Sequence, residues 1–143
     1  MGVTAQEIFD TVLTHLRKQG KAAKSIYGKC LYRGVGGTSC AVGCLIPDAM
    51  YDLRIEGLEV RHIMYGRFPG GRKSGAAELL PIVHRIAAHL GAEHVELLEE
   101  LQSAHDWALG PQGPLAWEDS MRRVAGKFNL KYTPPAGVFE ADQ

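Results

Sequence analysis

Apolar residues recur at helical spacing in several separate stretches of the chain. The first follows Thr4-Ala5-Gln6-Glu7, a capping box in which the Thr4 hydroxyl accepts from the Glu7 amide and the Glu7 side chain reaches back. Gly20 can adopt the left-handed conformation that closes a helix. The pattern therefore predicts a helix from residue 4 to residue 20. Its apolar face consists of Ile8, Phe9, Val12, Leu13 and Leu16.

Three later stretches show the same periodicity and end at helix-stop signals. We expect helices over residues 76–90, closed by Gly91, over residues 92–109, closed by Gly110-Pro111, and over residues 115–128. Residues 57–64 form a weak element that is compatible with either helix or strand. Residues 65–75, rich in glycine and arginine, are expected to form a loop.

The stretch between the first helix and these later helices favours extended structure. Residues 29–33 are typical of a short strand, and the glycine-rich turn signal at residues 34–37 follows them. Residues 39–46 fit either a returning hairpin strand or a short helix capped by Ser39, and Pro47 ends them. We therefore predict an α+β, helix-dominated fold of about four helices with a small β-hairpin.

Composition indicates one globular domain, which we expect to span residues 1–133, with a loosely ordered C-terminal tail at 134–143. There is no apolar run of about 18 residues for a membrane helix and no pattern typical of a secretory leader. Three cysteines are an odd number, which is typical of a reducing compartment. These features predict a cytoplasmic protein.

Charge is segregated although the net charge is zero. The acid-free stretch from residue 11 to residue 47 carries Arg17, Lys18, Lys21, Lys24, Lys29 and Arg33. The stretch from residue 92 to residue 106 lacks Lys and Arg and carries Glu93, Glu96, Glu99, Glu100 and Asp106. Such segments either attract a charged partner, or face each other, or solvate the surface.

Cys40 is a candidate nucleophile because glycine and hydroxyl residues precede it, where a helix could begin and lower the thiol pKa. His105 is the candidate base. The competing interpretation is packing, because Ala41 and Val42 beside Cys40 are typical of a core and His105 falls on an apolar stripe. Adjacent helix residues point about 100° apart, so Asp106 is poorly placed to orient His105.

Two further kinds of site are weakly indicated. Cys40 and Cys44, with Cys30 and either His62 or His105, could form a Cys3His zinc site, although only one loose cysteine pair is present. Residues 66–74 nearly match a phosphate-binding loop, but Arg72 is inserted before Lys73 and no partner strand ending in Asp follows. We therefore predict neither a metal nor another cofactor.

A mobile basic loop is the better interpretation of the second stretch, and it is the candidate binding surface. Cations and aromatic side chains alternate there, a combination that contacts acidic or nucleic-acid surfaces. No helix-turn-helix or other nucleic-acid signature supports a dedicated binder of DNA or RNA. The candidate contact residues are Arg61, Tyr65, Arg67, Phe68, Arg72 and Lys73.

Two motifs resemble known sequences. The first is Cys30-Leu-Tyr-Arg33 followed by Gly37-Thr-Ser-Cys-Ala-Val-Gly-Cys-Leu-Ile-Pro-Asp48, with Tyr51 and Glu56-Gly57 after it. The second is Leu101-Gln-Ser-Ala-His105-Asp106, with Trp117 later. Together they resemble a pattern in short proteins of tailed phages and prophages, a group that carries no activity to transfer.

That resemblance implies a phage accessory function. We expect a small protein that binds a host protein or nucleoprotein complex, with inhibition of a host defence system such as CRISPR as the leading specific hypothesis. Direct nucleic-acid binding is a further possibility, and no membrane partner is expected. The alternatives are a cysteine-dependent hydrolase or transferase that uses Cys40 and a zinc-stabilised binding domain.

Overall fold

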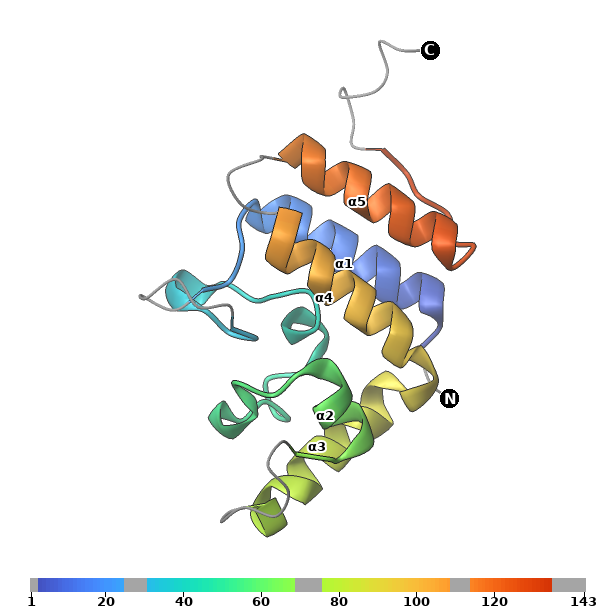
Figure 1. Cartoon of the computed structure of the whole chain (residues 1–143). Coiled ribbons are helices and arrows are strands. Elements are labelled where there is room, and N and C mark those ends of the chain that lie inside the picture. The colour runs from blue at the N-terminus through green and yellow to red at the C-terminus, as the bar shows by residue number, and fades with distance from the viewer. Residues whose placement is uncertain (1–2, 25–30, 69–75, 109–113, 135–143) are drawn as a thin grey trace.

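The structure is a computed structural model that describes residues 3–24, 31–68, 76–108 and 114–134. Its α-helices are α1 (Ala5–Gln19), α2 (Val60–Tyr65), α3 (Ala76–Leu90), α4 (Val95–Ala108) and α5 (Pro114–Lys127). Short 3-10 turns occur at η1 (Val35–Gly37), η2 (Gly43–Leu45), η3 (Leu53–Ile55) and η4 (Ala92–His94). Figure 1 shows α1, α4 and α5 side by side, with α2 and α3 packed at one end of this layer.

The first helix forms as its sequence predicts. The Thr4 hydroxyl accepts from the Glu7 amide at 3.1 Å, and the Glu7 carboxylate accepts from the Thr4 amide at 2.8 Å. Gly20 closes the helix with φ 73°, a left-handed conformation that favours glycine, and its amide donates to the Leu16 carbonyl at 2.8 Å. The capping box and the glycine together set both ends of α1.

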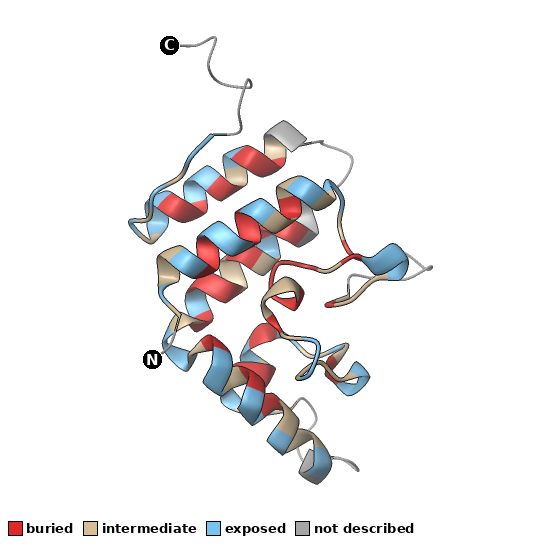
Figure 2. Ribbon diagram, turned by 180° about the vertical axis from the view of Figure 1, so that it is seen from behind, coloured by how far each residue is buried: buried red, intermediate tan, exposed pale blue. Residues whose placement is uncertain are grey.

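The later helices also lie close to their predicted ranges. α3 has the predicted bounds, and Gly91 after it has φ 92°. That turn leads into η4, so α4 begins at Val95 rather than at Ala92. The apolar faces of the helices turn toward one another and form the core, which Figure 2 shows as red stripes on the inner sides of the ribbons. The largest fully buried side chains include Trp117, Phe9, Leu98, Leu101 and Met121.

The α+β prediction is wrong, because the fold is all-α over the part of the chain that the structure describes. That part contains no strand, and an isolated antiparallel bridge joins Arg33 and Ser39. The weak element at 57–64 is a helix, α2, which is six residues long. Of the predicted strand at 29–33, residues 29 and 30 lie outside the described ranges.

The chain does reverse at the predicted glycine turn, but the backbone pairing there is too short to form a strand. The Gly34 amide donates to the Thr38 carbonyl at 2.9 Å, and the Cys40 amide donates to the Tyr32 carbonyl at 3.1 Å, as in a hairpin. Between these two bonds, the backbone of Ser39 is held by the Gln19 amide group, which accepts from Ser39 N at 2.8 Å and donates to Ser39 O at 2.9 Å. Because the Gln19 side chain satisfies both main-chain groups of Ser39, a further strand gains no partner at that residue.

The residues after α5 fold back along the helical layer. The Gln6 side chain exchanges two hydrogen bonds with the Lys131 backbone, at 2.9 and 3.0 Å, and Arg17 donates to the Thr133 carbonyl at 2.6 Å. Apart from Pro134, the predicted tail at 134–143 lies outside the described residues. Among the helices of the described ranges, none is long and apolar enough to span a bilayer.

Candidate functional site

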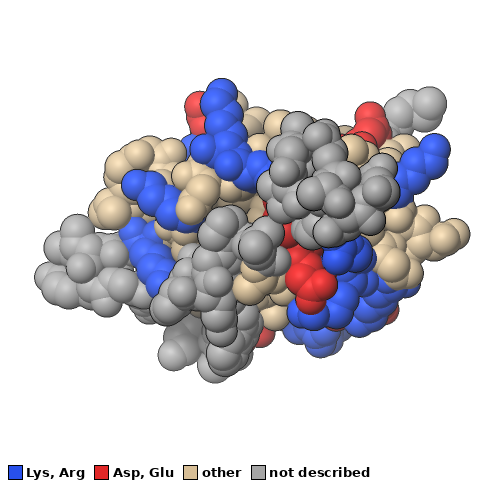
Figure 3. Space-filling view, turned by 90° about the horizontal axis from the view of Figure 1, so that it is seen from above, with Lys and Arg blue, Asp and Glu red and all other residues tan. Residues whose placement is uncertain are grey.

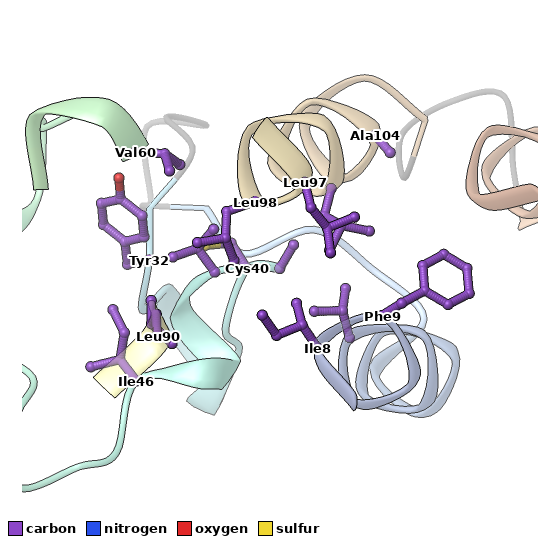
Figure 4. Close-up of a cluster of buried hydrophobic side chains, with 14 of the residues drawn as sticks. Ile8, Phe9, Tyr32, Cys40, Ile46, Val60, Leu90, Leu97, Leu98 and Ala104 are labelled. Atoms are coloured by element: carbon purple, nitrogen blue, oxygen red, sulfur yellow. The ribbon is translucent and has the colours of Figure 1, made fainter. Parts of the chain in front are cut away.

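Cys40, the candidate nucleophile, is part of the hydrophobic core. Its exposed fraction is 0%, and Figure 4 shows it within the cluster that includes Tyr32 and Leu98. Its sulfur accepts a hydrogen bond from the Gly43 amide at 3.1 Å, inside the tight turn that begins η2. A nucleophilic thiolate has to meet its substrate, so this environment favours a packing role for Cys40.

Cys44 lies nearer the surface but is also poorly suited to nucleophilic chemistry. Its thiol donates to the Ala41 carbonyl at 3.1 Å. Burial raises the pKa of this thiol to about 12. At neutral pH the Cys44 side chain is therefore a protonated thiol, which neither attacks an electrophile nor ligates a metal efficiently.

His105, the candidate base, is fully buried and already engaged. Its Nε2 accepts a hydrogen bond from the backbone amide of Ala23 at 3.1 Å, so Nδ1 carries the ring proton. The lone pair that a general base would use is thus committed to the main chain. The side chain of Asp106 lies outside the described part of the structure.

The zinc hypothesis gains no support from the described residues. Among them, no group of three or more His, Cys, Asp or Glu side chains is arranged to hold a metal ion. Cys40 and Cys44 both hydrogen-bond to the backbone of their own turn, and Cys30 lies outside the described ranges. The zinc site was an alternative and not the prediction, and one of its four members is unplaced.

The two sequence motifs meet in space through helix α4. The Gln102 side chain accepts from the Val42 amide at 3.1 Å, and His105, one turn further along α4, accepts from the Ala23 amide. Residues three apart share one face of a helix, so a single face of α4 holds two points of the long segment between α1 and α2. We call this pair, Gln102 and His105 with the amides they hold, the α4 brace.

A second set of bonds ties the same segment together from within. The Glu56 carboxylate accepts from the backbone amides of Tyr32 at 2.9 Å and Arg33 at 3.0 Å, and from the Tyr51 hydroxyl at 2.8 Å. Burial, together with the hydrogen bond to Glu56, raises the pKa of Tyr51 to about 12. Motif residues from Tyr32 to Glu56 therefore have a structural role.

Two glycines of the first motif are required by close backbone contacts. A Cβ at Gly43 would overlap the carbonyl oxygen of Tyr32, and one at Gly34 would lie 2.5 Å from the amide nitrogen of Lys24. Both contacts are to backbone atoms, which cannot rotate away as the end of a side chain can. The glycines thus allow the segment to fold tightly under the helices.

The predicted binding residues are divided by the structure into three groups. The Arg61 guanidinium forms two hydrogen bonds with the Glu99 carboxylate, at 2.7 and 3.0 Å, and these bonds lower the pKa of Glu99. Tyr65 and Arg67 are exposed, whereas Phe68 packs partly buried against the core. Arg72 and Lys73 lie outside the described residues, as does most of the stretch resembling a phosphate loop.

The charged segments do not pair with each other among the described side chains. The basic segment reaches α5 through Arg17 and Glu118, 2.8 Å apart. The acidic segment reaches α2 through Glu99 and α5 through Glu100, which is 2.6 Å from Lys127. On the face seen from above in Figure 3, Lys and Arg nevertheless cover more surface than Asp and Glu.

Sequence reasoning missed the residues that matter most to the loop, namely Gln19, Glu56 and Gln102. Each is a polar side chain that accepts from a backbone amide at least twenty residues away in the chain. Two signals in the sequence could have pointed to such roles. Gln102 lies on the same side of its predicted helix as the apolar stripe, and Glu56 lies inside a motif.

Comparisons with protein-family models, curated proteins and solved structures found no match.

Proposed function

We propose that this protein acts by binding another protein, through the end of α2 and the exposed side of α3. The binding surface consists of Tyr65, Arg67, His84 and Arg85, all of which are exposed. The observation that supports it most is the exposure of Tyr65, whose exposed fraction is 53%, two residues from the exposed Arg67.

Large exposed aromatic and arginine side chains together are typical of protein interfaces. Tyr and Arg are enriched among the residues that contribute most binding energy, because each combines apolar area with directed hydrogen bonds. The two helices that carry the surface pack against each other, and the left-handed Gly66 brings the end of α2 close to His84. Tyr65 and His84 thus belong to one continuous face.

The charge of this surface favours an acidic partner. Arg67 and Arg85 form no ion pair with any side chain in the described ranges, so their charges are available. The nearby Glu99 carboxylate is neutralised by Arg61, which removes the main acid that could oppose a partner's carboxylates. Because the chain as a whole has zero net charge, a protein partner fits better than a nucleic acid.

We further propose that the partner is a protein of a bacterial host. The motif pair that resembles proteins of tailed phages supports a phage accessory protein whose target is a host protein. Inhibition of a host defence system, such as a CRISPR complex, is the specific activity we propose on that basis. A cysteine-dependent reaction is not proposed, because Cys40 and His105 are both buried and hydrogen-bonded to the main chain.

Affinity capture from a bacterial lysate tests the binding function. The wild-type chain and a Tyr65→Ala/Arg67→Glu double variant would be compared with Lys18→Glu, a charge reversal of an exposed residue on α1. We expect one stoichiometric acidic protein on the wild type and on Lys18→Glu, and its loss from the double variant.

Two results would overturn the proposal. One is a partner that remains on the double variant at the wild-type level, since the contact would then lie elsewhere. The other is capture that disappears after nuclease treatment, which would identify nucleic acid as the bound species.

A further inference from the structure

An open hollow of about 510 Å³ lies between the glycine turn and the end of η2. His15 of α1 contributes to its wall, and Thr38 and Ser39 lie on the side of the glycine turn. Ile46, Asp48 and Arg33 also line the hollow. Its volume is in the range of small-molecule sites, about 300–1,000 Å³.

Arg33 is positioned firmly within this hollow. Its Nη2 donates to the Ile46 carbonyl at 2.7 Å, and its guanidinium carbon lies 4.7 Å from the centre of the Tyr51 ring. These two contacts fix the plane of the guanidinium group. A planar guanidinium held in place offers a second N–H edge in a defined direction, which is how arginine selects oxyanions.

That second edge is occupied by a carboxylate of the protein itself. Arg33 Nη1 lies 2.8 Å from Asp48 Oδ1, yet the Asp48 side chain is 95% exposed. An ion pair whose acid is this exposed contributes little to stability. A dissolved anion can therefore displace the Asp48 carboxylate from this edge of the guanidinium group.

The surroundings of the hollow favour an anion. Asp48 is the only acid among the residues that line it in the described ranges. The backbone carbonyl of Lys24 accepts from the Val35 amide at 3.0 Å and that of Lys21 accepts from Gln19, which also holds Ser39, but neither lysine lines the hollow. Both lysines lie in the acid-free segment from residue 11 to residue 47.

We propose that this hollow binds an anionic small molecule whose phosphate or carboxylate group takes the place of Asp48 on Arg33. Ser39 supplies a hydroxyl group for the polar part of the ligand, and Ile46 supplies an apolar contact. The site is independent of the binding surface on α2 and α3. Asp48 acts as an internal competitor, so removing its charge strengthens binding.

Amide chemical shifts measured during ligand titration test this site at constant ionic strength. The probes are inorganic phosphate, AMP and glutarate, with adenosine as the uncharged counterpart of AMP. We expect the amides of residues 33–48 to shift with at least one anion and not with adenosine. The probe that binds most tightly shows whether the site prefers a phosphate or a carboxylate group.

Variants give the test its sharpest form. Asp48→Asn should bind the anion about twofold to fivefold more tightly, the range that an exposed ion pair provides. Asp52→Asn is the matched control, because Asp52 is paired with Arg54 at 3.0 Å and does not line the hollow. Its affinity should equal that of the wild type.

Arg33→Lys, checked for retention of fold by circular dichroism, should lose most of the affinity, because an ammonium group lacks the planar second edge. If Arg33→Lys fails to fold, the comparison of Asp48→Asn with Asp52→Asn decides. Equal affinity of Asp48→Asn and wild type, shifts spread evenly over the surface, or no shift with any anion would overturn the proposal.

Discussion

The imidazole of His105 on α4 accepts a hydrogen bond from the backbone amide of Ala23, 82 residues earlier in the chain, at 3.1 Å. Ala23 and His105 are both completely buried. The bond therefore satisfies a main-chain donor that has no access to water, and it fixes where the chain runs after α1. A histidine that looks like a general base in the sequence is thus part of the architecture.

Replacing His105 by alanine should destabilise the fold by about 3 kcal/mol, because it leaves a buried amide unpaired and opens a cavity. Urea unfolding followed by circular dichroism measures the change. His89→Ala, on the exposed side of α3, is the control and should change stability by less than about 0.5 kcal/mol. Similarly small changes in the free energy of unfolding for both variants would show that His105 does not stabilise the fold as we expect.

Much of the helical fold could be predicted from the sequence, and the loop could not. The capping box at Thr4 and the glycines at 20 and 91 are local signals that act within a few residues. The hairpin prediction failed because the backbone pairing around the turn is short, and further bonds that fix residues 31–42 come from Gln19, Glu56 and Gln102. No local sequence pattern predicts which side chain will hydrogen-bond to a backbone amide far away in the chain.

The candidate site shows the same division. The prediction that Cys40 packs in the core, which competed with the nucleophile hypothesis, matches its complete burial. The hollow beside Arg33 was not foreseen, because it forms only when residues 15, 33 and 48 are brought together by the fold. Tyr65 and Arg67 are exposed, but Tyr65 is the last residue of α2 rather than part of the predicted loop, and Arg61 is held by Glu99.

Thiol labelling should distinguish a buried core from an active site. In a Cys30→Ser background, native Cys40 and Cys44 should react with iodoacetamide far more slowly than in urea at the same pH. Since the Cys44 pKa is raised to about 12, its labelling rate should climb about tenfold per pH unit from pH 8 to 10. Peptide mass spectrometry reports each site, and a rate plateau below pH 9 would contradict a buried thiol.

Alkaline pH should weaken the fold through the same groups. Cys44 and Tyr51 both have folded-state pKa values near 12, above their ordinary values of about 8.5 and 10. The folded state therefore holds protons that the unfolded state releases, and stability falls as pH rises from about 9 toward 12. Cys44→Ala should make this decline shallower between pH 9 and 10, whereas an unchanged slope would argue against the raised thiol pKa.

The buried carboxylate of Glu118 should contribute more than the exposed ion pairs. Its side chain is 5% exposed and accepts from Arg17 at 2.8 and 2.9 Å and from the Tyr132 hydroxyl. Glu118→Gln should cost about 2 kcal/mol or more, because Arg17 loses its partner in a partly buried setting. Glu100→Gln, which breaks a more exposed pair with Lys127, should cost less than about 1 kcal/mol.

The two glycine positions Gly43 and Gly126 should respond in opposite ways to alanine. Gly43→Ala forces a Cβ into the Tyr32 carbonyl and should destabilise the protein by about 3 kcal/mol or prevent folding. Gly126 lies in α5 with open space around it, so Gly126→Ala should stabilise by about 0.5–1 kcal/mol. Thermal unfolding of the two variants gives the signs, and a stable Gly43→Ala protein would contradict the tight turn.

Native-state hydrogen exchange at Ala23 and Val42 tests the α4 brace most directly. Both amides should be protected in the wild type, although neither belongs to a helix that could protect it. Protection of Ala23 should fall selectively in His105→Ala, and that of Val42 in Gln102→Ala. Rapid exchange of both amides in the wild type, or equal loss at every amide in each variant, would contradict the brace.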